Sequence, residues 1–145
     1  MVTIKRISAT ETHAVRHPVL RAGKALSDCI FENDDAVTTV HLGLYHNNVL
    51  AAVASIFDQQ NPASKGQKQY QLRGMAVLPE FQNRHFGRKL LDKVEQSISG
   101  CNAVLWFNAR AAAVPFYQKS GFVTVGEPFE VNDIGTHYVM YKEIA

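Results

Sequence analysis

The sequence predicts a mixed α/β domain, and the prediction depends on the spacing of its apolar residues and on the order of the resulting elements. Seven apolar segments have the length and composition of strands, namely residues 2–7, 38–44, 49–57, 70–77, 103–107, 123–125 and 138–141. Three segments have helical spacing or composition, namely residues 10–22, 86–98 and 111–119. A meander of strands therefore comes first and a strand–helix–strand crossover follows, in a single domain over residues 1–145.

The first helical segment carries its own start signal and an interruption. Thr10 is placed as an N-cap, and Glu11 adds negative charge to the first turn, where the helix dipole favours it. Pro18 falls inside the pattern and lacks a backbone N–H. The sequence therefore predicts a kink at Pro18 or two short helices.

Turn-forming residues separate the strands of the first half. Residues 46–48 (His-Asn-Asn) suit a hairpin turn because asparagine tolerates positive φ, and residues 33–35 (Asn-Asp-Asp) predict another turn. Residues 58–69 are polar and contain Pro62 and Gly66, which predicts a surface loop.

The two later helices are bounded by glycines. One helical face collects the apolar residues Phe86, Leu90, Leu91, Val94 and Ile98. Gly100 is placed to stop this helix, and Gly121 ends the next one. Pro115 is tolerated in that last helix if it begins near residue 111, since the first N–H groups of a helix are unpaired.

Composition and charge exclude several classes of protein. A chain of 145 residues with 46% hydrophobic and 19% charged residues is ordinary for a globular domain, and a net charge of +2 gives no strong field for nucleic acid or an anionic membrane. No apolar run approaches the ~20 residues of a membrane span, and residues 1–6 lack the apolar core of a signal peptide. With only Cys29 and Cys101, we expect a cytoplasmic protein without a disulfide framework.

Residues 75–91 are the most informative segment. An apolar strand ends at Pro79, a short loop follows, and an amphipathic helix begins near Arg84. The first N–H groups of that helix and its dipole form an anion site suited to a pyrophosphate, which Gly87 lets approach the backbone. Arg84, Arg88 and Lys89 add positive charge. The alternative is an ordinary strand–loop–helix connection whose cations are only solvated.

Two motifs give the chain a resemblance to a known family. Val77-Leu78-Pro79 followed by Gln82 and Gly87 resembles the acetyl-CoA-binding signature of the GNAT acetyltransferases, with His85 where the family usually has glycine. Residues 108–110 (Asn-Ala-Arg) and residues 116–122 (Phe-Tyr-Gln-Lys-Ser-Gly-Phe) resemble a later GNAT element. The resemblance covers at least residues 70–125.

The resemblance implies a fold, a reaction and a site. The fold would be a mostly antiparallel sheet flanked by helices and splayed at the signature strand, and the reaction would be direct attack of a primary amine on acetyl-CoA in a ternary complex, without a metal. The implied cofactor-binding residues are Met75, Ala76, Val77, Gln82, Asn83, Arg84, His85, Phe86, Gly87, Arg88, Asn108 and Phe116. Val77 is the expected main-chain donor to the oxyanion.

The implied catalytic residues are Tyr117 and His137, each with an alternative. Tyr117 matches the general acid that protonates the leaving thiolate, or is a packing aromatic. Asn108 orients the pantetheine arm, or caps a helix. The base is His137, Glu80, His41 or a water chain, and His137 has the useful titration range.

The acceptor is left open by the sequence. Arg16, His17 and Arg21 either roof the acceptor site or form an ordinary basic helix face, and Arg73 reaches either the cleft or the opposite face. Glu127 and Glu130, expected in a loop, are candidates to bind a cationic substrate.

Two other functions are weighed against the acetyltransferase. One is a non-catalytic acetyl-CoA-sensing module, which His85 favours, and the other is a nucleic-acid-binding domain, which the low net charge disfavours. Partners beyond an amine acceptor, including a second copy in a homodimer, are also left open.

Overall fold

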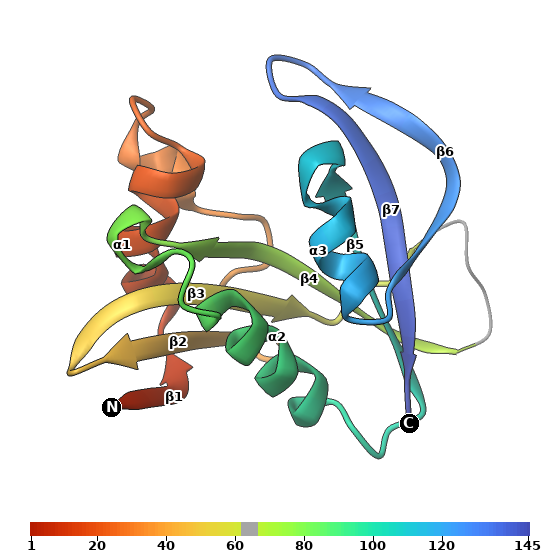
Figure 1. The fold of residues 1–145 in the computed structure, drawn as a ribbon, viewed down its shortest axis with the longest axis horizontal. Coiled ribbons are helices and arrows are strands. Elements are labelled where there is room, and N and C mark those ends of the chain that lie inside the picture. The colour runs from red at the N-terminus through yellow and green to blue at the C-terminus, as the bar shows by residue number, and fades with distance from the viewer. Residues whose placement is uncertain (62–66) are drawn as a thin grey trace. The chain divides into compact units, whose positions relative to one another are not determined.

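The computed structural model describes residues 1–61 and 67–145, and the chain divides into two compact units. Unit 1 comprises Met1–Asp58 and Leu72–Ser97, and unit 2 comprises Gln59–Gln71 and Ile98–Ala145. The elements, labelled in Figure 1, are β1 (Val2–Ile7), α1 (Ala9–Leu20), η1 (Leu26–Cys29), β2 (Val40–His46), β3 (Val49–Phe57), β4 (Lys68–Val77), η2 (Pro79–Phe81), α2 (Phe86–Ser97), β5 (Ala103–Arg110), η3 (Ala111–Ala113), α3 (Val114–Lys119), β6 (Val123–Val131) and β7 (Gly135–Ile144).

The described strands form one mixed sheet with the hydrogen-bonded order β1-β2-β3-β4-β5-β7-β6. The pairs β1–β2, β2–β3, β5–β7 and β6–β7 are antiparallel, and β4 pairs with β5 in parallel. This arrangement confirms the predicted mixed α/β fold with flanking helices. The residues Pro62 and Gly66 of the predicted loop lie outside the described residues.

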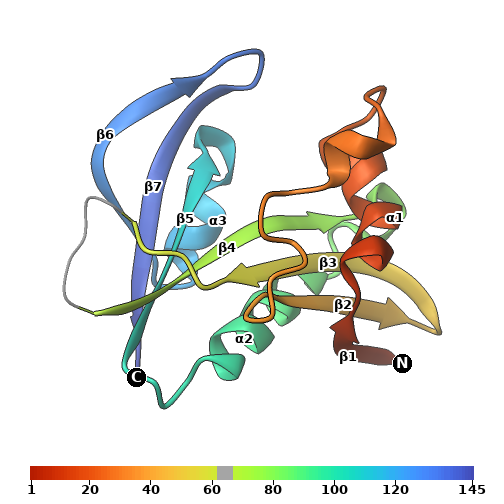
Figure 2. The ribbon, with the colours of Figure 1, turned by 180° about the vertical axis from the view of Figure 1, so that it is seen from behind.

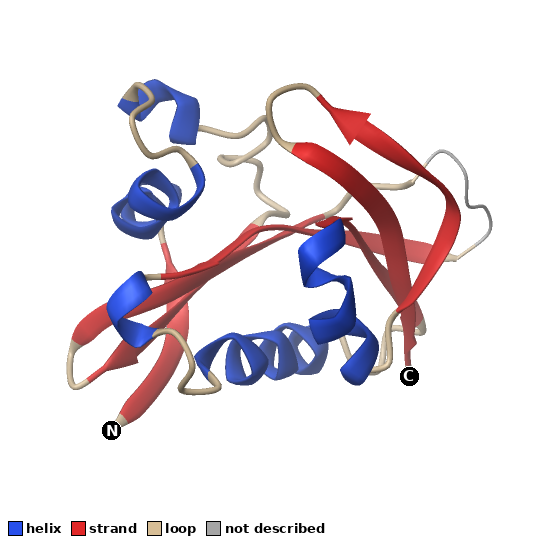
Figure 3. Cartoon of the chain, turned by 45° about the horizontal axis from the view of Figure 1, so that its top comes forward, coloured by secondary structure: helices blue, strands red, loops and turns tan. Residues whose placement is uncertain are grey.

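Unit 1 places helices on both faces of its strands. In Figure 3, α1 and α2 lie on opposite faces of β2 and β3. Accordingly, β3 is buried without interruption from Ala51 to Phe57, as expected for a strand covered on both sides. One side of the core joins Ile7, Val15, Val53 and Ala76. On the other, α2 buries the predicted stripe from Phe86 to Val94.

The hairpin between β2 and β3 turns as the sequence predicts. Asn47 and Asn48 have φ of 49° and 69°, the left-handed pair that a two-residue hairpin turn requires. The pairing of His46 with Val49 shows that β2 extends two residues beyond the predicted end at residue 44.

Helix α1 corrects two predictions. The N-cap is Ser8, not Thr10, because Ser8 Oγ accepts the Glu11 N–H at 3.1 Å while Glu11 Oε1 accepts the Ser8 N–H at 2.9 Å. Pro18 does not divide the helix, which continues to Leu20, since Pro18 lies in its last turn.

Unit 2 is built on β5 and the β6–β7 hairpin, which Figure 2 shows from behind. β4 contributes Lys68–Gln71, paired with Ala103–Trp106. The segment 111–119 is a 3₁₀ turn followed by α3. Pro115 lies in the first turn of α3, where a proline costs no hydrogen bond within the helix. Strands β6 and β7 are longer than predicted, so Glu127 and Glu130 lie in a strand rather than a loop.

Candidate active site

The loop between η2 and α2 has the backbone conformation of an anion-binding turn. Asn83 and His85 have φ of 64° and 63°. Such alternation of left-handed and ordinary residues directs successive N–H groups into one concavity. Lys89 N–H donates to His85 O at 3.0 Å, the first hydrogen bond of α2. The N–H groups of residues 86–88 therefore precede the first intrahelical bond and have no partner within the helix.

The loop is held in place at its two ends. Gln82 Nε2 donates to Val77 O at 3.0 Å, which ties the signature glutamine back to the end of β4. Phe81 and Phe86 lie 5.8 Å and 5.5 Å from the His46 ring, and 6.3 Å from each other. The aromatic cluster anchors the loop on the hairpin end of β2, so the N–H groups are positioned before any ligand arrives.

The predicted loop residues divide into buried and exposed groups. Phe86 is buried among the rings, so its backbone N–H, rather than its side chain, is available to a ligand. Arg84 and His85 are exposed, and Arg84 lies over the Phe81 ring at 5.6 Å. Arg88 is also exposed and its Nε is 3.2 Å from Asp92 Oδ1. Arg88 therefore shares its charge with Asp92, whereas no described carboxylate pairs with Arg84 beside the turn.

The signature strand β4 has an irregularity at Gly74. Its φ is 65°, the left-handed conformation that glycine takes at bulges. Of the three predicted residues that follow, Ala76 is buried in the unit 1 core, while Met75 and Val77 are half-buried. Val77 O is occupied by Gln82, and the role of the Val77 N–H as oxyanion donor stays a prediction.

Tyr117 lies in α3 of unit 2 among aromatic rings. The ring centroids of Phe107, Phe116 and Phe122 are 4.3, 5.0 and 6.1 Å away. This burial raises the pKa of Tyr117 to about 12. The hydroxyl makes no hydrogen bond to any described residue. The phenol therefore stays protonated at neutral pH with its proton uncommitted.

Asn108 and Phe116, also in unit 2, have exposed side chains. Asn108 lies within β5 opposite Val139, and the N-caps of η3 and α3 are Arg110 and Ala113. The helix-capping alternative for Asn108 is therefore wrong. Phe116 is 39% exposed, unusual for a large apolar side chain in a helix.

His137 lies within β7 rather than before it. It is buried, it stacks on Phe129 at 5.8 Å, and its Nδ1 is 2.9 Å from Gly135 O. Because a carbonyl oxygen only accepts, Nδ1 carries the proton in this contact, and Nε2 of the neutral ring has the free lone pair. The tautomer suits a base that acts through Nε2.

The other candidate bases differ in their surroundings. Glu80 is exposed on η2. His41 is buried in unit 1, with Nε2 2.8 Å from Asp34 O and Nδ1 2.6 Å from Ser55 Oγ. Both ring nitrogens of His41 are thereby engaged inside the unit, which leaves none for a substrate.

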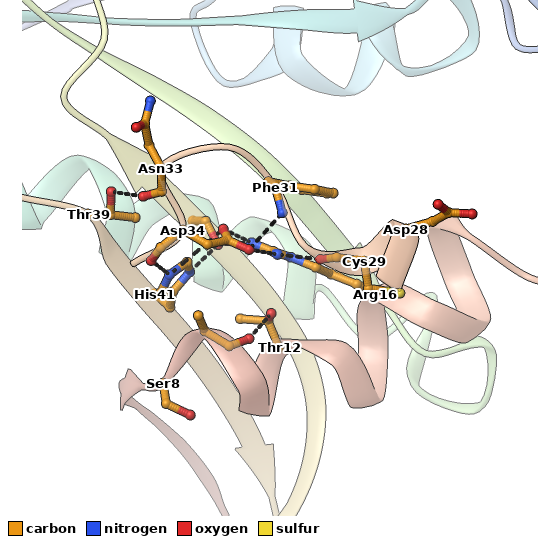
Figure 4. A network of polar contacts seen from close by, with 12 residues as sticks. Ser8, Thr12, Arg16, Asp28, Cys29, Phe31, Asn33, Asp34, Thr39 and His41 are labelled. Carbon is orange, nitrogen blue, oxygen red and sulfur yellow. Dashed lines mark hydrogen bonds and ion pairs between the residues drawn. The ribbon is translucent and has the colours of Figure 1, made fainter. Parts of the chain in front are cut away.

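The region of Arg16 differs most from its prediction. Arg16 is fully buried rather than on a basic helix face, and Figure 4 shows it in a polar network. Its Nη1 and Nη2 donate to the two carboxylate oxygens of Asp34 at 2.6 and 3.0 Å, and Nη2 also donates to Ser55 Oγ at 2.9 Å. The same Ser55 Oγ lies 2.6 Å from His41 Nδ1, which extends the network to His41. We call Arg16, Asp34, Ser55 and His41 the interior network.

The sequence signals locate the site residues in two groups. Residues 75–77 and 82–88 lie in unit 1, and residues 108, 116, 117 and 137 lie in unit 2. Sequence reasoning missed the contribution of Phe31, which three arginines surround. An aromatic residue beside a turn has no sequence pattern that would predict its contact with three arginines.

The described residues contain neither a candidate membrane span nor a candidate metal cluster. No helix there is long and apolar enough to cross a membrane. No group of three or more His, Cys, Asp or Glu residues is arranged to hold a metal ion.

Comparisons with known proteins agree on one family. Residues 14–144 match the model of the acetyltransferase (GNAT) domain. The chain is 36% identical to the uncharacterized N-acetyltransferase YitI of Bacillus subtilis (strain 168), over 99% of this chain and 97% of the relative. The ribosomal-protein-S18-alanine N-acetyltransferase from Escherichia coli matches with a TM-score of 0.78 at 21% identity, over 100% and 95% of the two chains. An aminoglycoside 6'-N-acetyltransferase complexed with coenzyme A matches with a TM-score of 0.77 at 11% identity, over 99% and 97%.

The chain therefore belongs to the GNAT acetyltransferase family. The predicted family, the fold class, the enzyme class of acetyl-CoA-dependent N-acetyltransferase and the acetyl-CoA co-substrate are thereby confirmed.

Proposed function

We propose that this N-acetyltransferase holds the coenzyme pyrophosphate on the backbone of residues 82–88 and acetylates a primary amine. The observation that carries the proposal is the left-handed pair Asn83 and His85 immediately before α2. This backbone supplies N–H groups to an anion without any side chain, and Arg84 and Arg88 add charge beside it. His85 adopts the conformation for which the family uses glycine, so the turn keeps its shape despite the substitution.

The chemistry requires two proton movements at this chain's own residues. Acetyl-CoA supplies an activated thioester, and the amine nitrogen forms the new bond to carbon as the bond to sulfur breaks. A lysine-like amine has a pKa near 10.4, so its ammonium form first loses one proton to solvent. As the neutral amine attacks, its nitrogen loses a second proton, for which we propose His137 Nε2 as the base. Tyr117 Oη donates its own proton to the departing sulfur, and the proton taken by His137 returns through solvent to the Tyr117 oxygen, so one proton is released per turnover.

The pKa of Tyr117 sets an expectation for its contribution. Since that pKa is about 12, donation to a thiolate whose conjugate acid has a pKa of about 8.5 is uphill in the free enzyme. We therefore expect an effect near the lower end of the range for general acid catalysis, about 100-fold. Because of this pKa, a fall in kcat with rising pH that occurs below about pH 12 cannot come from deprotonation of Tyr117.

The test compares two tyrosine variants in acetyl-CoA turnover with a panel of primary amines, followed by release of free thiol. Tyr117→Phe should lower kcat about 100-fold while the coenzyme affinity, measured by calorimetry, changes little. Tyr141→Phe removes a hydroxyl from β7 in the same unit and should leave kcat unchanged. An unchanged kcat in Tyr117→Phe would remove Tyr117 from the acid role.

Calorimetry also separates the remaining alternatives. Coenzyme binding without turnover of any amine would favour the non-catalytic sensing module. Absence of binding would overturn the pyrophosphate site at residues 82–88. We also propose a cytoplasmic location, which the two free cysteines, Cys29 and Cys101, support.

A further inference from the structure

Three arginines of unit 1 surround the ring of Phe31. The guanidinium carbons of Arg16, Arg73 and Arg21 lie 3.9, 4.7 and 5.3 Å from its centroid. Arg73 also lies 5.6 Å from the ring of Phe57. Three like charges at one ring repel one another, so their convergence needs compensation by negative charge.

One carboxylate compensates one of the three cations. Both oxygens of Asp34 accept from Arg16, and Oδ2 also accepts the Phe31 N–H at 2.9 Å. Arg21 donates Nε to Asp28 O at 3.3 Å and Nη1 to Leu20 O at 3.0 Å. These two acceptors are neutral carbonyls, and no carboxylate of the described residues forms an ion pair with Arg21.

Arg73 is the least satisfied member of the cluster. Its guanidinium lies against the rings of Phe31 and Phe57, and no described residue accepts a hydrogen bond from it. The carboxylates of Asp34 and Glu32 attract its charge without pairing with it. Burial, followed by the neighbouring Arg16 charge, lowers the pKa of Arg73. A half-buried guanidinium with five N–H donors and no acceptor gains stability from any oxyanion that reaches it.

The cluster is fixed in place by Gly74, which follows Arg73 with a φ of 65°. A Cβ at this position would lie 2.9 Å from Phe31 Cε2 and 3.2 Å from Arg16 Nε. Only glycine therefore permits the ring and the arginine to approach the strand this closely. Val77 lies four residues after Arg73 in β4, which corresponds to roughly 13 Å at the rise per residue of a strand.

We propose that Arg73, with Arg21 and Phe31, binds an oxyanion group of the acceptor, a carboxylate or a phosphate, so that the enzyme selects amines that carry such a group. This inference rests on the proposed function, because it names a feature of the acceptor of that reaction. The site lies on β4, the strand that also carries the proposed oxyanion donor Val77. An acceptor that bridges the two would hold its anion up to about 13 Å from its reacting amine.

The test uses amines that differ only in the anion. The pairs are 6-aminohexanoate with hexylamine, and 6-aminohexyl phosphate with 6-aminohexanol, so the two arms distinguish carboxylate from phosphate. The wild type should show a kcat/KM at least about 10-fold higher for the anionic member of one pair. Arg73→Met should abolish this advantage through KM, and leave the neutral amines within about twofold.

Three controls separate the anion site from general effects of charge and folding. Arg73→Lys should retain part of the preference, because it keeps the charge without the planar fork. Lys93→Gln removes one exposed positive charge from α2 and should retain all of it. Arg21→Gln should reduce the preference as a second variant of the cluster, whether or not Arg73→Met folds.

Two results would overturn the inference while leaving the acetyltransferase intact. One is equal kcat/KM for the anionic and neutral members of both pairs, and the other is an equal loss for both members in Arg73→Met. If no amine is acetylated, the proposed function has failed. Calorimetry with 6-aminohexanoate and inorganic phosphate then decides the site, since binding lost in Arg73→Met supports it and absence of binding to the wild type overturns it.

Discussion

Two polar regions of unit 1 use their charged groups in opposite ways. In the interior network, Arg16 donates to Asp34 and Ser55, and His41 uses both ring nitrogens. In the loop at residues 82–88, the N–H groups precede the first bond of α2 and the charged side chains are exposed. The interior network pairs most of its polar groups internally, with the buried Arg16 Nε as an exception, and so supports folding. A region that leaves donors unpaired at the surface is suited to a ligand.

The comparison predicts that substitutions in the two regions change different quantities. Loss of a partner in the interior network should change the free energy of unfolding, because a buried charge is left without its counterion. Changes in the loop should have small effects on that free energy, because its side chains are exposed, and should act on coenzyme binding instead.

The largest expected effect is that of Arg16→Met. It leaves the buried Asp34 carboxylate without its bidentate partner, and we expect a loss of about 3–5 kcal/mol in the free energy of unfolding, measured in urea. The double variant Arg16→Met/Asp34→Asn should recover part of this loss, because no buried charge then lacks a partner. A loss below about 1 kcal/mol in the single variant would show that the network is not essential for folding.

An acid titration of stability sharpens the same comparison. Burial raises the pKa of Asp34, but the hydrogen bonds from Arg16 and from the Phe31 N–H outweigh it, so the pKa lies below its ordinary value of 3.8. A carboxyl with a depressed folded-state pKa contributes stability that is present above pH 3.8 and is lost as pH falls through the folded value.

The matched variant for that titration is Asp34→Asn. The wild type should lose stability below about pH 4 more steeply than Asp34→Asn, by up to about 1.4 kcal/mol per pH unit for one proton. Thermal unfolding followed by circular dichroism between pH 2.5 and 7 measures both slopes. Identical slopes would show that Asp34 does not titrate differently in the folded and unfolded states.

Local patterns in the sequence predicted much of the fold. The asparagines at residues 47 and 48, the stripe on α2 and the glycines after the helices each act within a few residues, so their conformations follow from local sterics and burial. The loop before α2 was predicted from the same kind of pattern, but α2 begins at Phe86 rather than near Arg84, and the left-handed conformations of Asn83 and His85 were not predicted. The N-cap of α1 was misplaced because Thr10 and Ser8 are both capping residues, and the reciprocal bonds to Glu11 selected Ser8.

The interior network could not be predicted, because its partners come from distant segments. Arg16 meets Asp34 and Ser55 across 18 and 39 residues, and an arginine on an amphipathic helix normally faces water. The cluster at Phe31 has the same origin, since Gly74 admits the ring only where β4 passes it. Contacts set by the packing of α1 on β3 leave no periodic signal in the sequence.

The smallest expected effect is that of His85→Gly in the loop. A histidine with a φ of 63° bears a conformational cost that glycine avoids, partly offset by the greater freedom of glycine in the unfolded chain. We expect the free energy of unfolding to rise by about 0.5–1 kcal/mol. Because the His85 side chain is exposed, the N–H groups should bind the coenzyme as before, with Kd changed less than about threefold.

His85→Ala is the matched control, because it removes the imidazole but keeps a Cβ in the left-handed conformation. If the backbone alone binds the pyrophosphate, both variants should show nearly the same coenzyme Kd in calorimetry. A Kd weakened about 10-fold in both would make the imidazole a phosphate ligand, which would transfer affinity from the backbone to a side chain. A Kd tightened about 10-fold in His85→Gly alone would show that the Cβ of residue 85 obstructs the anion. The loop would then share with the interior network the property that its own side chains occupy the space around its polar groups.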